Sequence, residues 1–201
     1  MSQLKIGFFG GTFDPPHLGH LALARKAFEQ MALDQVLWVL TPLSPLKHKT
    51  FATLKQRIKM IELMVSVENC FEFSRVDLVR TPPYYSVDTA KLIRQQYQEP
   101  IELYCILGAD SLKYLPKWYH HKEFVFDRVD GIIVADRPGV TIDMNELNSK
   151  VPGIKKRLYR IDMPKINISS ANIREAISEG RDISSMVTTP VNELIKNEAV
   201  Y

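Results

Sequence analysis

Residues 4–33 of the chain read LKIGFFGGTFDPPHLGHLALARKAFEQMAL. The run at residues 4–10 is apolar and has the length of a buried strand. From Leu18 onward, apolar residues recur at helical spacing among strong helix formers. Between these two patterns lies GGTFDPPH, at residues 10–17, whose glycines and prolines are typical of a loop. The stretch therefore predicts a strand, a loop and a helix in that order, which is the repeating unit of an α/β protein.

The alternation of strands and helices continues along the rest of the chain. Further strands are predicted at residues 35–41, 71–74, 101–108, 130–136 and 157–162. Helices are predicted at residues 18–33, 53–67, 86–97, 143–150, 170–180 and 190–200, with a short helical region that ends near residue 126. Because the strands are almost continuously apolar, we expect a parallel sheet that is covered by helices on both faces. The sequence thus predicts one Rossmann-like, doubly wound α/β domain over residues 1–201, with a helical C-terminal segment.

The ends of these predicted helices carry residues that favour helix termini. Thr53 and Ser86 each stand at the start of a helical pattern, and both are expected to act as N-caps. Gly180 follows a helical pattern and is expected at the C′ position, where glycine is common. Pro190 falls in the first turn of the last helix, where its missing N–H group removes no helical hydrogen bond.

The composition narrows the class of protein. The chain has 201 residues, of which 45% are hydrophobic and 24% charged, and these values are typical of folded globular proteins. The net charge of +3 is too small to indicate nucleic acid as a partner, and no apolar segment is long enough to span a membrane. The N-terminal residues lack the pattern of a signal peptide, so we expect a cytoplasmic location. Cys70 and Cys105 are expected to be buried free thiols.

The loop at residues 10–17 has the features of an anion site. Gly10 and Gly11 let the backbone approach a ligand closely, and the helix that follows begins near His17 or Leu18. His17 and His20 then lie one turn apart on the same face of the first helical turn. The N–H groups at the start of a helix and its positive dipole end favour a group such as phosphate.

Other motifs fit this loop less well. Neither GxxxxGK[ST] nor GxGxxG is present, so the loop matches neither a P-loop nor a dinucleotide-redox fingerprint. The two histidines lack a third ligand at a spacing typical of zinc. A capped turn with two surface histidines remains as the structural alternative.

Two stretches resemble the signatures of the adenylyl- and cytidylyltransferase superfamily. GGTFDPPHLGH, at residues 10–20, resembles its T/HxGH signature, and INISSANIREAISEG, at residues 166–180, resembles its I-S-S-T-x-I-R signature. Four further stretches are similar to segments of the bacterial nicotinate mononucleotide adenylyltransferases. They are SPLKHK at 44–49, YYSVDT at 84–89, GADSLKYLPKW at 108–118 and VADRPG at 134–139.

This resemblance implies an enzyme that transfers the adenylyl group of ATP to nicotinate mononucleotide and releases pyrophosphate, a reaction of NAD biosynthesis. It implies His17, His20 and Arg174 as catalytic residues. The ATP-binding residues would be Gly10, Gly11, Thr12, Phe13, His17, His20, Ser169, Ser170 and Arg174. The acceptor-binding residues would be Lys49, Ser86, Asp110, Trp118, Tyr119 and Arg137. The expected cofactor is Mg²⁺, held by the phosphates of ATP and by no protein ligands.

The chain departs from the family pattern at two places. Leu46 and Lys47 replace the prolines that usually precede His-Lys, so we expect a less rigid loop and an additional cation within reach of a phosphate. Ala171 replaces a frequent threonine, which removes one hydroxyl near the phosphates.

Several alternatives stay open from the sequence. Ser170 and Asp110 could each be a helix N-cap, and Trp118 could be a core residue. His120 and His121 beside Glu123 indicate a solvated turn more than a metal site. The acceptor could be nicotinamide mononucleotide or another phosphorylated molecule, and the protein could be a nucleotide-binding sensor without turnover. The small-molecule substrates are the expected partners, and the oligomeric state is open.

Overall fold

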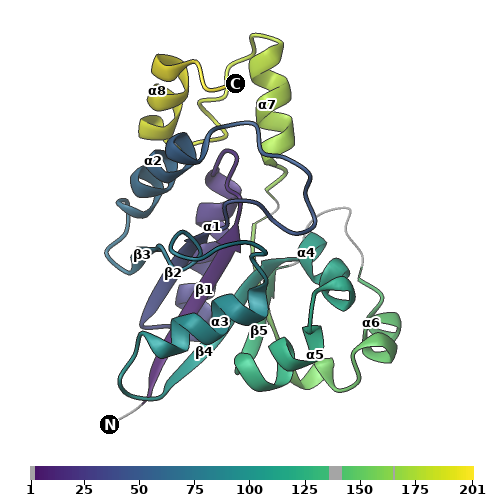
Figure 1. Cartoon of the computed structure of the whole chain (residues 1–201). Coiled ribbons are helices and arrows are strands. Elements are labelled where there is room, and N and C mark those ends of the chain that lie inside the picture. Colours follow the sequence, from purple (N-terminus) through teal and green to yellow (C-terminus); the bar gives the residue numbers. More distant parts are fainter. Residues whose placement is uncertain (1–2, 136–141, 165) are drawn as a thin grey trace.

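The computed structural model describes residues 3–135, 142–164 and 166–201. Within these residues, one sheet has the strand order β3-β2-β1-β4-β5-β6, and every neighbouring pair is parallel (Figure 1). The strands are β1 (Leu4–Gly11), β2 (Gln35–Leu40), β3 (Phe71–Ser74), β4 (Ile101–Gly108), β5 (Gly131–Ala135) and β6 (Leu158–Ile161). All six predicted strands are confirmed, and the last residue of the predicted strand at 130–136 lies outside the described residues.

The helices fall where the periodicity predicts them. They are α1 (Leu18–Met31), α2 (Leu54–Val65), α3 (Ser86–Gln95), α4 (Ala109–Tyr114), α5 (His121–Glu123), α6 (Met144–Lys150), α7 (Ser170–Ser178) and α8 (Thr189–Glu198). Two single 3₁₀ turns, η1 (Leu115–Lys117) and η3 (Ile154–Arg157), and one π-helical turn, η2 (Phe124–Arg128), complete the described elements. The predicted C-terminal helical segment is confirmed by α7 and α8.

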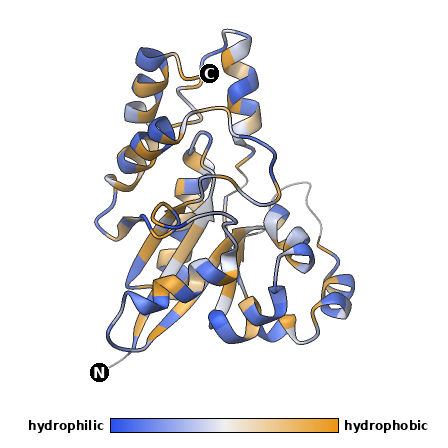
Figure 2. Ribbon diagram, in the orientation of Figure 1, coloured by the Kyte–Doolittle hydropathy of each residue, from blue (hydrophilic) through white to orange (hydrophobic). Residues whose placement is uncertain are grey.

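Two hydrophobic cores lie on opposite faces of the sheet, because successive side chains of a strand point to opposite faces. Phe9 and Trp38 belong to the core that includes residues of α1, α2, α7 and α8. Their neighbours Phe8 and Leu37 belong to the core that includes residues of α3, α4 and α6. Figure 2 shows the strands as mostly hydrophobic and the helices as mixed in character. The predicted doubly wound fold, with helices on both faces of a parallel sheet, is confirmed.

The strand order places a binding crevice at one end of the sheet. The chain moves outward from β1 through β2 to β3, and then returns to the other side of β1 to build β4, β5 and β6. The loops that leave β1 and β4 therefore diverge at the carboxyl ends of these strands, where ligands of such sheets bind. In Figure 1 this is the upper end of the molecule, opposite the end marked N and toward α2, α7 and α8.

Most of the predicted helix ends are confirmed, but one is wrong. Thr53 caps α2 by accepting a hydrogen bond from the backbone N–H of Gln56, and Gly180 has a positive φ of 68° beyond the end of α7. The N-cap of α3 is Tyr85, however, and Ser86 is the first helical residue. The carbonyl of Tyr85 accepts hydrogen bonds from the side chain of Thr89 in the first turn and from that of Arg80 before the helix, and both stabilise the earlier start.

The two cysteines differ in exposure. Both are free, and Cys105 is buried in β4 as expected, whereas Cys70 is only half-buried. The expectation of a buried thiol is therefore wrong for Cys70, because it precedes β3 at the edge of the sheet, where fewer elements cover the chain. No helix in the described ranges is both long and apolar enough to cross a membrane.

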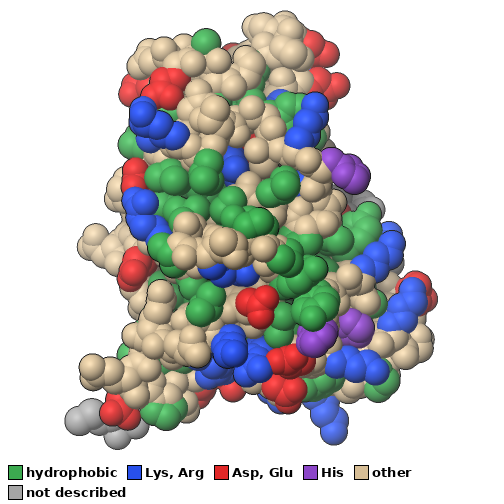
Figure 3. All heavy atoms as spheres, viewed as in Figure 1, with side chains coloured by type: hydrophobic (Ala, Val, Ile, Leu, Met, Phe, Trp, Pro, Cys, Tyr) green, Lys and Arg blue, Asp and Glu red, His purple; other side chains and the backbone are tan. Residues whose placement is uncertain are grey.

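Apolar side chains are also exposed on one face. Figure 3 shows them gathered across the middle of that face, where Figure 1 shows the loops that follow β2 and β3. These loops contribute Leu43, Leu46, Phe51 and Val79, which are all exposed. Phe51 contacts residues of the candidate site, as described below.

Candidate active site

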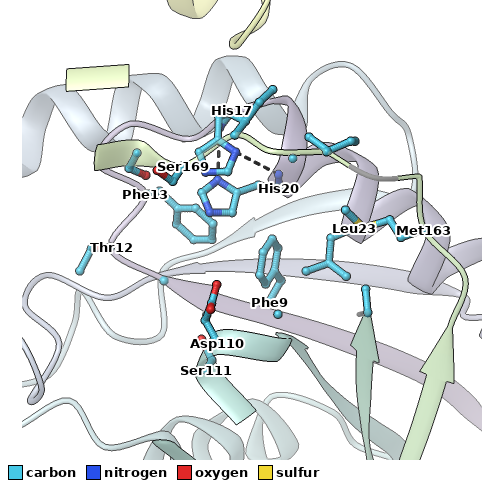
Figure 4. Close-up of a pocket in the computed structure, with 18 of the residues that line it drawn as sticks. Phe9, Thr12, Phe13, His17, His20, Leu23, Asp110, Ser111, Met163 and Ser169 are labelled. Carbon is cyan, nitrogen blue, oxygen red and sulfur yellow. Dashed lines mark hydrogen bonds between the residues drawn. The ribbon is translucent and has the colours of Figure 1, made fainter. Parts of the chain in front are cut away.

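A pocket of about 360 Å³ opens at the carboxyl ends of the central strands (Figure 4). Its walls come from the end of β1 and the loop after it, the start of α1, the start of α4, the end of β5, and the segment that leads into α7. The predicted ATP residues that line it are Gly10, Gly11, Thr12, Phe13, His17, His20, Ser169 and Ser170. The structure thus brings together both ends of the sequence, as the two quoted signatures require.

His17 and His20 form a reciprocal cap at the start of α1. His17 is the N-cap, and its Nδ1 accepts a hydrogen bond from the backbone N–H of His20 at 3.3 Å. His20 Nδ1 accepts one from the backbone N–H of His17 at 3.2 Å. The two rings stack on each other (Figure 4), and their centroids are 3.6 Å apart. Because each Nδ1 is an acceptor, the neutral ring carries its proton on Nε2, which makes Nε2–H a donor.

Aromatic residues under the pair hold its rings in place. The His20 ring lies in edge contact with Phe9 and Phe13, at centroid distances of 5.6 Å and 5.2 Å. Phe13 has a positive φ of 44°, which is unfavourable for a large side chain, and its ring is buried against Trp38. A Cβ at Gly11 would lie 3.2 Å from the Phe13 ring, so a larger residue here would require the ring to move by a few tenths of an ångström. Gly11 therefore contributes to the packing of Phe13.

Gly19 has a similar role, which the sequence analysis did not assign. A Cβ at this position would lie 3.1 Å from His17 Nδ1, the atom that accepts the hydrogen bond from His20. The glycine of HLGH therefore keeps space for the stacked pair. The position of Gly19 between two histidines at helical spacing could have indicated this role from the sequence.

Of the two lysines at positions 47 and 49, it is Lys47 that contacts the loop at residues 10–17. Lys47 is exposed as a whole, but it lines the pocket, and its Nζ donates a hydrogen bond to Thr12 Oγ1 at 2.7 Å. Burial of its ammonium group lowers the pKa of Lys47, and the charges of Arg174 and Arg57 lower it further, against the opposite effect of Asp14. Lys49 does not line the pocket, and its Nζ lies 5.1 Å from the centroid of the Phe51 ring.

The buried carboxylate of Asp14 connects two loops: the histidine loop, at residues 12–17, and the Lys47 loop, at residues 41–53. It accepts the backbone N–H groups of Phe51 and Ala52, at 2.7 Å and 3.0 Å. It also accepts the hydroxyl of Tyr201 at 2.9 Å. Asp14 is only 4% exposed, so these donors take the place of the water molecules that the carboxylate loses on burial.

Arg57 donates hydrogen bonds to the histidine loop and to the Lys47 loop. It is 2% exposed, and its guanidinium donates to the carbonyl oxygens of Thr12, Thr41 and Pro42. Burial lowers the pKa of Arg57, and the negative charge of Asp14 raises it in part. Arg57 was not among the predicted site residues, although an arginine on the buried face of a predicted amphipathic helix was a signal.

Arg174 lies beside the pocket but does not line it. Its Nη1 donates to the carbonyl oxygen of Asp14 at 2.6 Å, and its guanidinium carbon lies 4.0 Å from the centroid of the Phe51 ring. The start of α7 is fixed by two serines. Ser169 is the N-cap and accepts the backbone N–H of Asn172, whereas the hydroxyl of Ser170 donates to the carbonyl of Pro15. The alternative of Ser170 as N-cap is therefore wrong.

Of the predicted acceptor residues, the pocket brings in Asp110. Asp110 is the second residue of α4, whose N-cap is Gly108, so the alternative of Asp110 as N-cap is wrong. Figure 4 shows Asp110 and Ser111 opposite the histidine pair. Ser111 also lines the pocket, and the sequence analysis did not assign it.

The other predicted acceptor residues lie outside this pocket. Trp118 is half-buried against Phe124, with ring centroids 5.5 Å apart, so it has the core contacts of the structural alternative. Tyr119 is half-exposed and stacks on Tyr85 at 4.2 Å, next to Ser86. Lys49, Ser86, Trp118 and Tyr119 do not line the pocket, and Arg137 lies outside the described residues.

His120 lies at an exposed turn, as expected, whereas His121 is half-buried and begins α5. His120 Nδ1 lies 2.9 Å from Glu123 Oε2 at an exposed position, and Arg128 pairs with the same carboxylate. Hydrogen bonds from His120 and Arg128 hold the pKa of Glu123 below its usual value. Among the residues that the structure describes, no group of three or more His, Cys, Asp or Glu could hold a metal ion.

Known proteins resemble this chain in sequence and in fold. The model of the cytidylyltransferase-like family matches residues 8–176. A relative from Roseiflexus sp., named "Probable nicotinate-nucleotide adenylyltransferase", is 36% identical over 202 residues, which cover 100% of both chains. A relative of the same name from Dehalococcoides mccartyi is 34% identical over 203 residues, which cover 100% of this chain and 98% of the relative.

The fold is also that of a solved structure. The nicotinic acid mononucleotide adenylyltransferase of Plasmodium falciparum, complexed with NaAD, superimposes with a TM-score of 0.78. The match covers 99% of this chain and 98% of the other, at 20% sequence identity. The chain belongs to the cytidylyltransferase-like family of nucleotidyltransferases and, within it, to the nicotinate-nucleotide adenylyltransferases.

Proposed function

We propose that this chain transfers the adenylyl group of ATP to nicotinate mononucleotide, with nicotinate adenine dinucleotide and pyrophosphate as products. The observation that carries the proposal is the stacked and reciprocally capped pair of His17 and His20, which lines a pocket at the start of α1. The membership of the nicotinate-nucleotide adenylyltransferases gives the substrate class. The neighbouring Plasmodium structures, complexed with NaAD and with APC, support the same assignment.

The reaction needs alignment and charge neutralisation more than a general base. A phosphate oxygen of the acceptor attacks the α-phosphorus of ATP, a new P–O bond forms, and the bond between the α-phosphorus and the bridging oxygen breaks. Pyrophosphate leaves with that oxygen. The attacking oxygen is already ionised at neutral pH, so the protein mainly aligns two anions and stabilises charge on the leaving group.

The residues around the pocket suit this task. The Nε2–H donors inferred for His17 and His20, and the backbone N–H groups at the start of α1, would bind the phosphates of ATP. Gly10 and Gly11 would let the backbone approach the nucleotide. Lys47 supplies a positive charge beside Thr12, and we assign it to the same phosphates.

The segment that leads into α7 completes the proposed ATP site. Ser169 and Ser170 line the pocket and would present hydroxyl and N–H groups to phosphate. Arg174 lies next to them and would contact the β- or γ-phosphate through a guanidinium that now stacks on Phe51. Mg²⁺ prefers oxygen ligands, which the phosphates of ATP supply. We therefore propose that Mg²⁺ enters with ATP, bound to its phosphate oxygens.

The acceptor would bind on the side of α3 and α4. Asp110 faces the pocket and would accept hydrogen bonds from a ribose. The stack of Tyr85 and Tyr119 brings the start of α3 next to the segment that carries Trp118. This contact supports an acceptor site formed by both segments, in which Trp118 and Tyr119 border the pyridine ring and backbone N–H groups near Ser86 meet the carboxylate. Lys49 and Arg137 remain proposed contacts for the acceptor.

Acceptor choice tests the proposal. A site with N–H donors accepts the carboxylate of nicotinate, whereas the NH₂ group of nicotinamide would face donors of the same kind. We expect kcat/KM to be at least about tenfold higher for nicotinate mononucleotide, because one mismatched polar contact costs on the order of 1–3 kcal/mol. Pyrophosphate release with ATP and each mononucleotide measures the ratio. Equal values or a preference for the amide would contradict the proposed acceptor site, and no release with either would favour a nucleotide sensor.

We further propose that the chain acts as one domain in the cytoplasm. Its two hydrophobic cores share a single sheet, and its two free cysteines fit a reducing compartment.

A further inference from the structure

Tyr201 reaches the candidate site from the far end of the sequence. Its hydroxyl donates a hydrogen bond to Asp14 Oδ1 at 2.9 Å, although the two residues are 187 positions apart. Its ring packs against the core that includes α7 and α8, and it borders a second pocket of about 430 Å³ between these helices. Tyr201 does not line the first pocket, so the structure gives it no direct contact with the proposed ATP site.

Asp14 is the point at which three segments of the site meet. It stands three residues before His17, and its carboxylate accepts the N–H groups of Phe51 and Ala52 at the end of the loop that carries Lys47. Its carbonyl oxygen accepts a hydrogen bond from Arg174. A displacement of Asp14 would therefore change the positions of the histidine pair, of Lys47 and of Arg174 at the same time.

The Tyr201 hydroxyl is a constant donor to this carboxylate. Burial raises the pKa of Tyr201, and the negative charge of Asp14 raises it further, so the proton stays on the phenol throughout the physiological range. Asp14 Oδ1 accepts from Ala52 N–H and from Tyr201, whereas Oδ2 accepts from Phe51 N–H. Loss of the phenol proton donor would leave the buried Oδ1 with one hydrogen-bond donor, the Ala52 N–H, in place of two.

We infer that Tyr201 is a positioning residue for adenylyl transfer. It acts through Asp14, which keeps the histidine loop and the Lys47 loop in fixed positions relative to each other. The inference rests on the proposed function of the pocket. It predicts that removal of one hydroxyl, outside the pocket, lowers turnover without a matching effect on acceptor binding.

Tyr201→Phe tests this, because it removes the hydroxyl and keeps the ring. The matched control is Tyr104→Phe. The Tyr104 hydroxyl also donates to a carboxylate, that of Glu102, at 2.7 Å, and Tyr104 does not line the pocket. For Tyr201→Phe we expect kcat to fall about tenfold or more, as is typical when reacting groups are misplaced, while KM for the acceptor stays within about twofold. Tyr104→Phe should keep the kcat of the parent chain. The two variants should have similar midpoints of thermal unfolding.

Amide hydrogen exchange gives a second readout that does not depend on turnover. The N–H groups of Phe51 and Ala52, which donate to Asp14, should exchange at least about tenfold faster in Tyr201→Phe and at an unchanged rate in Tyr104→Phe. An unchanged kcat or unchanged exchange in Tyr201→Phe would overturn the inference. If the parent chain itself released no pyrophosphate, the proposed function would fail, and the exchange result would still decide whether Tyr201 holds the two loops.

Discussion

Replacing Lys47 by methionine removes a charge from the candidate ATP site with little change in side-chain length. In the structure, Lys47 Nζ lies 2.7 Å from Thr12 Oγ1 and lines the pocket, so a phosphate bound beside Thr12 would lie within contact distance of the ammonium. The variant Lys47→Met is therefore expected to lower kcat/KM for ATP while the fold is retained.

The size of this effect follows from the contact. Two unit charges about 4 Å apart attract by about 4 kcal/mol at an effective dielectric constant of about 20. Part of this gain is offset, because the ammonium is already partly desolvated, as its lowered pKa indicates. A charge-assisted hydrogen bond of this kind is worth about 1.5–3 kcal/mol in mutational series, so kcat/KM for ATP should fall by about 10- to 150-fold.

The assay is pyrophosphate release at saturating acceptor with varied ATP. Lys55→Met is the matched control, because it removes the same charge from an exposed lysine in the first turn of α2 that does not line the pocket. If Lys47→Met kept kcat/KM for ATP within about threefold of Lys55→Met, the assignment of Lys47 to the phosphates would be refuted.

The pH dependence gives an independent check on Lys47. Since burial lowers its pKa, Lys47 loses its charge at a lower pH than an exposed lysine does. Affinity for ATP should therefore fall as pH rises through this lowered pKa, and Lys47→Arg should move the fall to higher pH. The unfolded chain binds the proton more tightly than the folded one, so the contribution of Lys47 to stability becomes less unfavourable with rising pH across the window between the two pKa values.

Three further substitutions test other parts of the site. His20→Ala should lower kcat at least about a hundredfold, because it removes a donor at the leaving group, while circular dichroism shows a retained fold; near-normal turnover in the folded variant would contradict its role. Arg174→Lys should raise KM for ATP, because an ammonium cannot reproduce a planar fork that stacks on Phe51, and an unchanged KM would leave Arg174 with a structural role. Arg57→Met should reduce the free energy of unfolding by about 3 kcal/mol or more in urea titration, because buried carbonyl oxygens lose their donor; a loss below about 1 kcal/mol would show that the arginine is dispensable for the fold.

Local sequence patterns determined the elements of this protein and the centre of its site. Helical periodicity reflects side chains three and four positions apart, and a short apolar run indicates a buried strand whatever its partner is, so the six strands and the main helices could be predicted. The positions of His17 and His20 on one face follow from helical geometry alone, and so does their place at the start of a helix after the first strand.

Capping was predicted less well, because a helix start also depends on partners from elsewhere. The N-cap of α7 is Ser169 and that of α3 is Tyr85, one residue before the predicted serine in each case. At α7, the hydroxyl of Ser170 donates to the carbonyl of Pro15, 155 positions away, a contact that no local pattern encodes.

Only the tertiary structure decided which charged residues surround the histidine pair. The sequence predicted both Lys47 and Lys49 as cations near the substrates, yet the path of their loop brings only Lys47 to Thr12. Asp14 and Tyr201 are joined by packing of α7 and α8 on the sheet, which periodicity within either segment cannot predict. The physical reason is that hydrogen bonds within a helix join residues that are close in sequence. A binding site, in contrast, forms where loops from distant positions meet at the carboxyl ends of parallel strands.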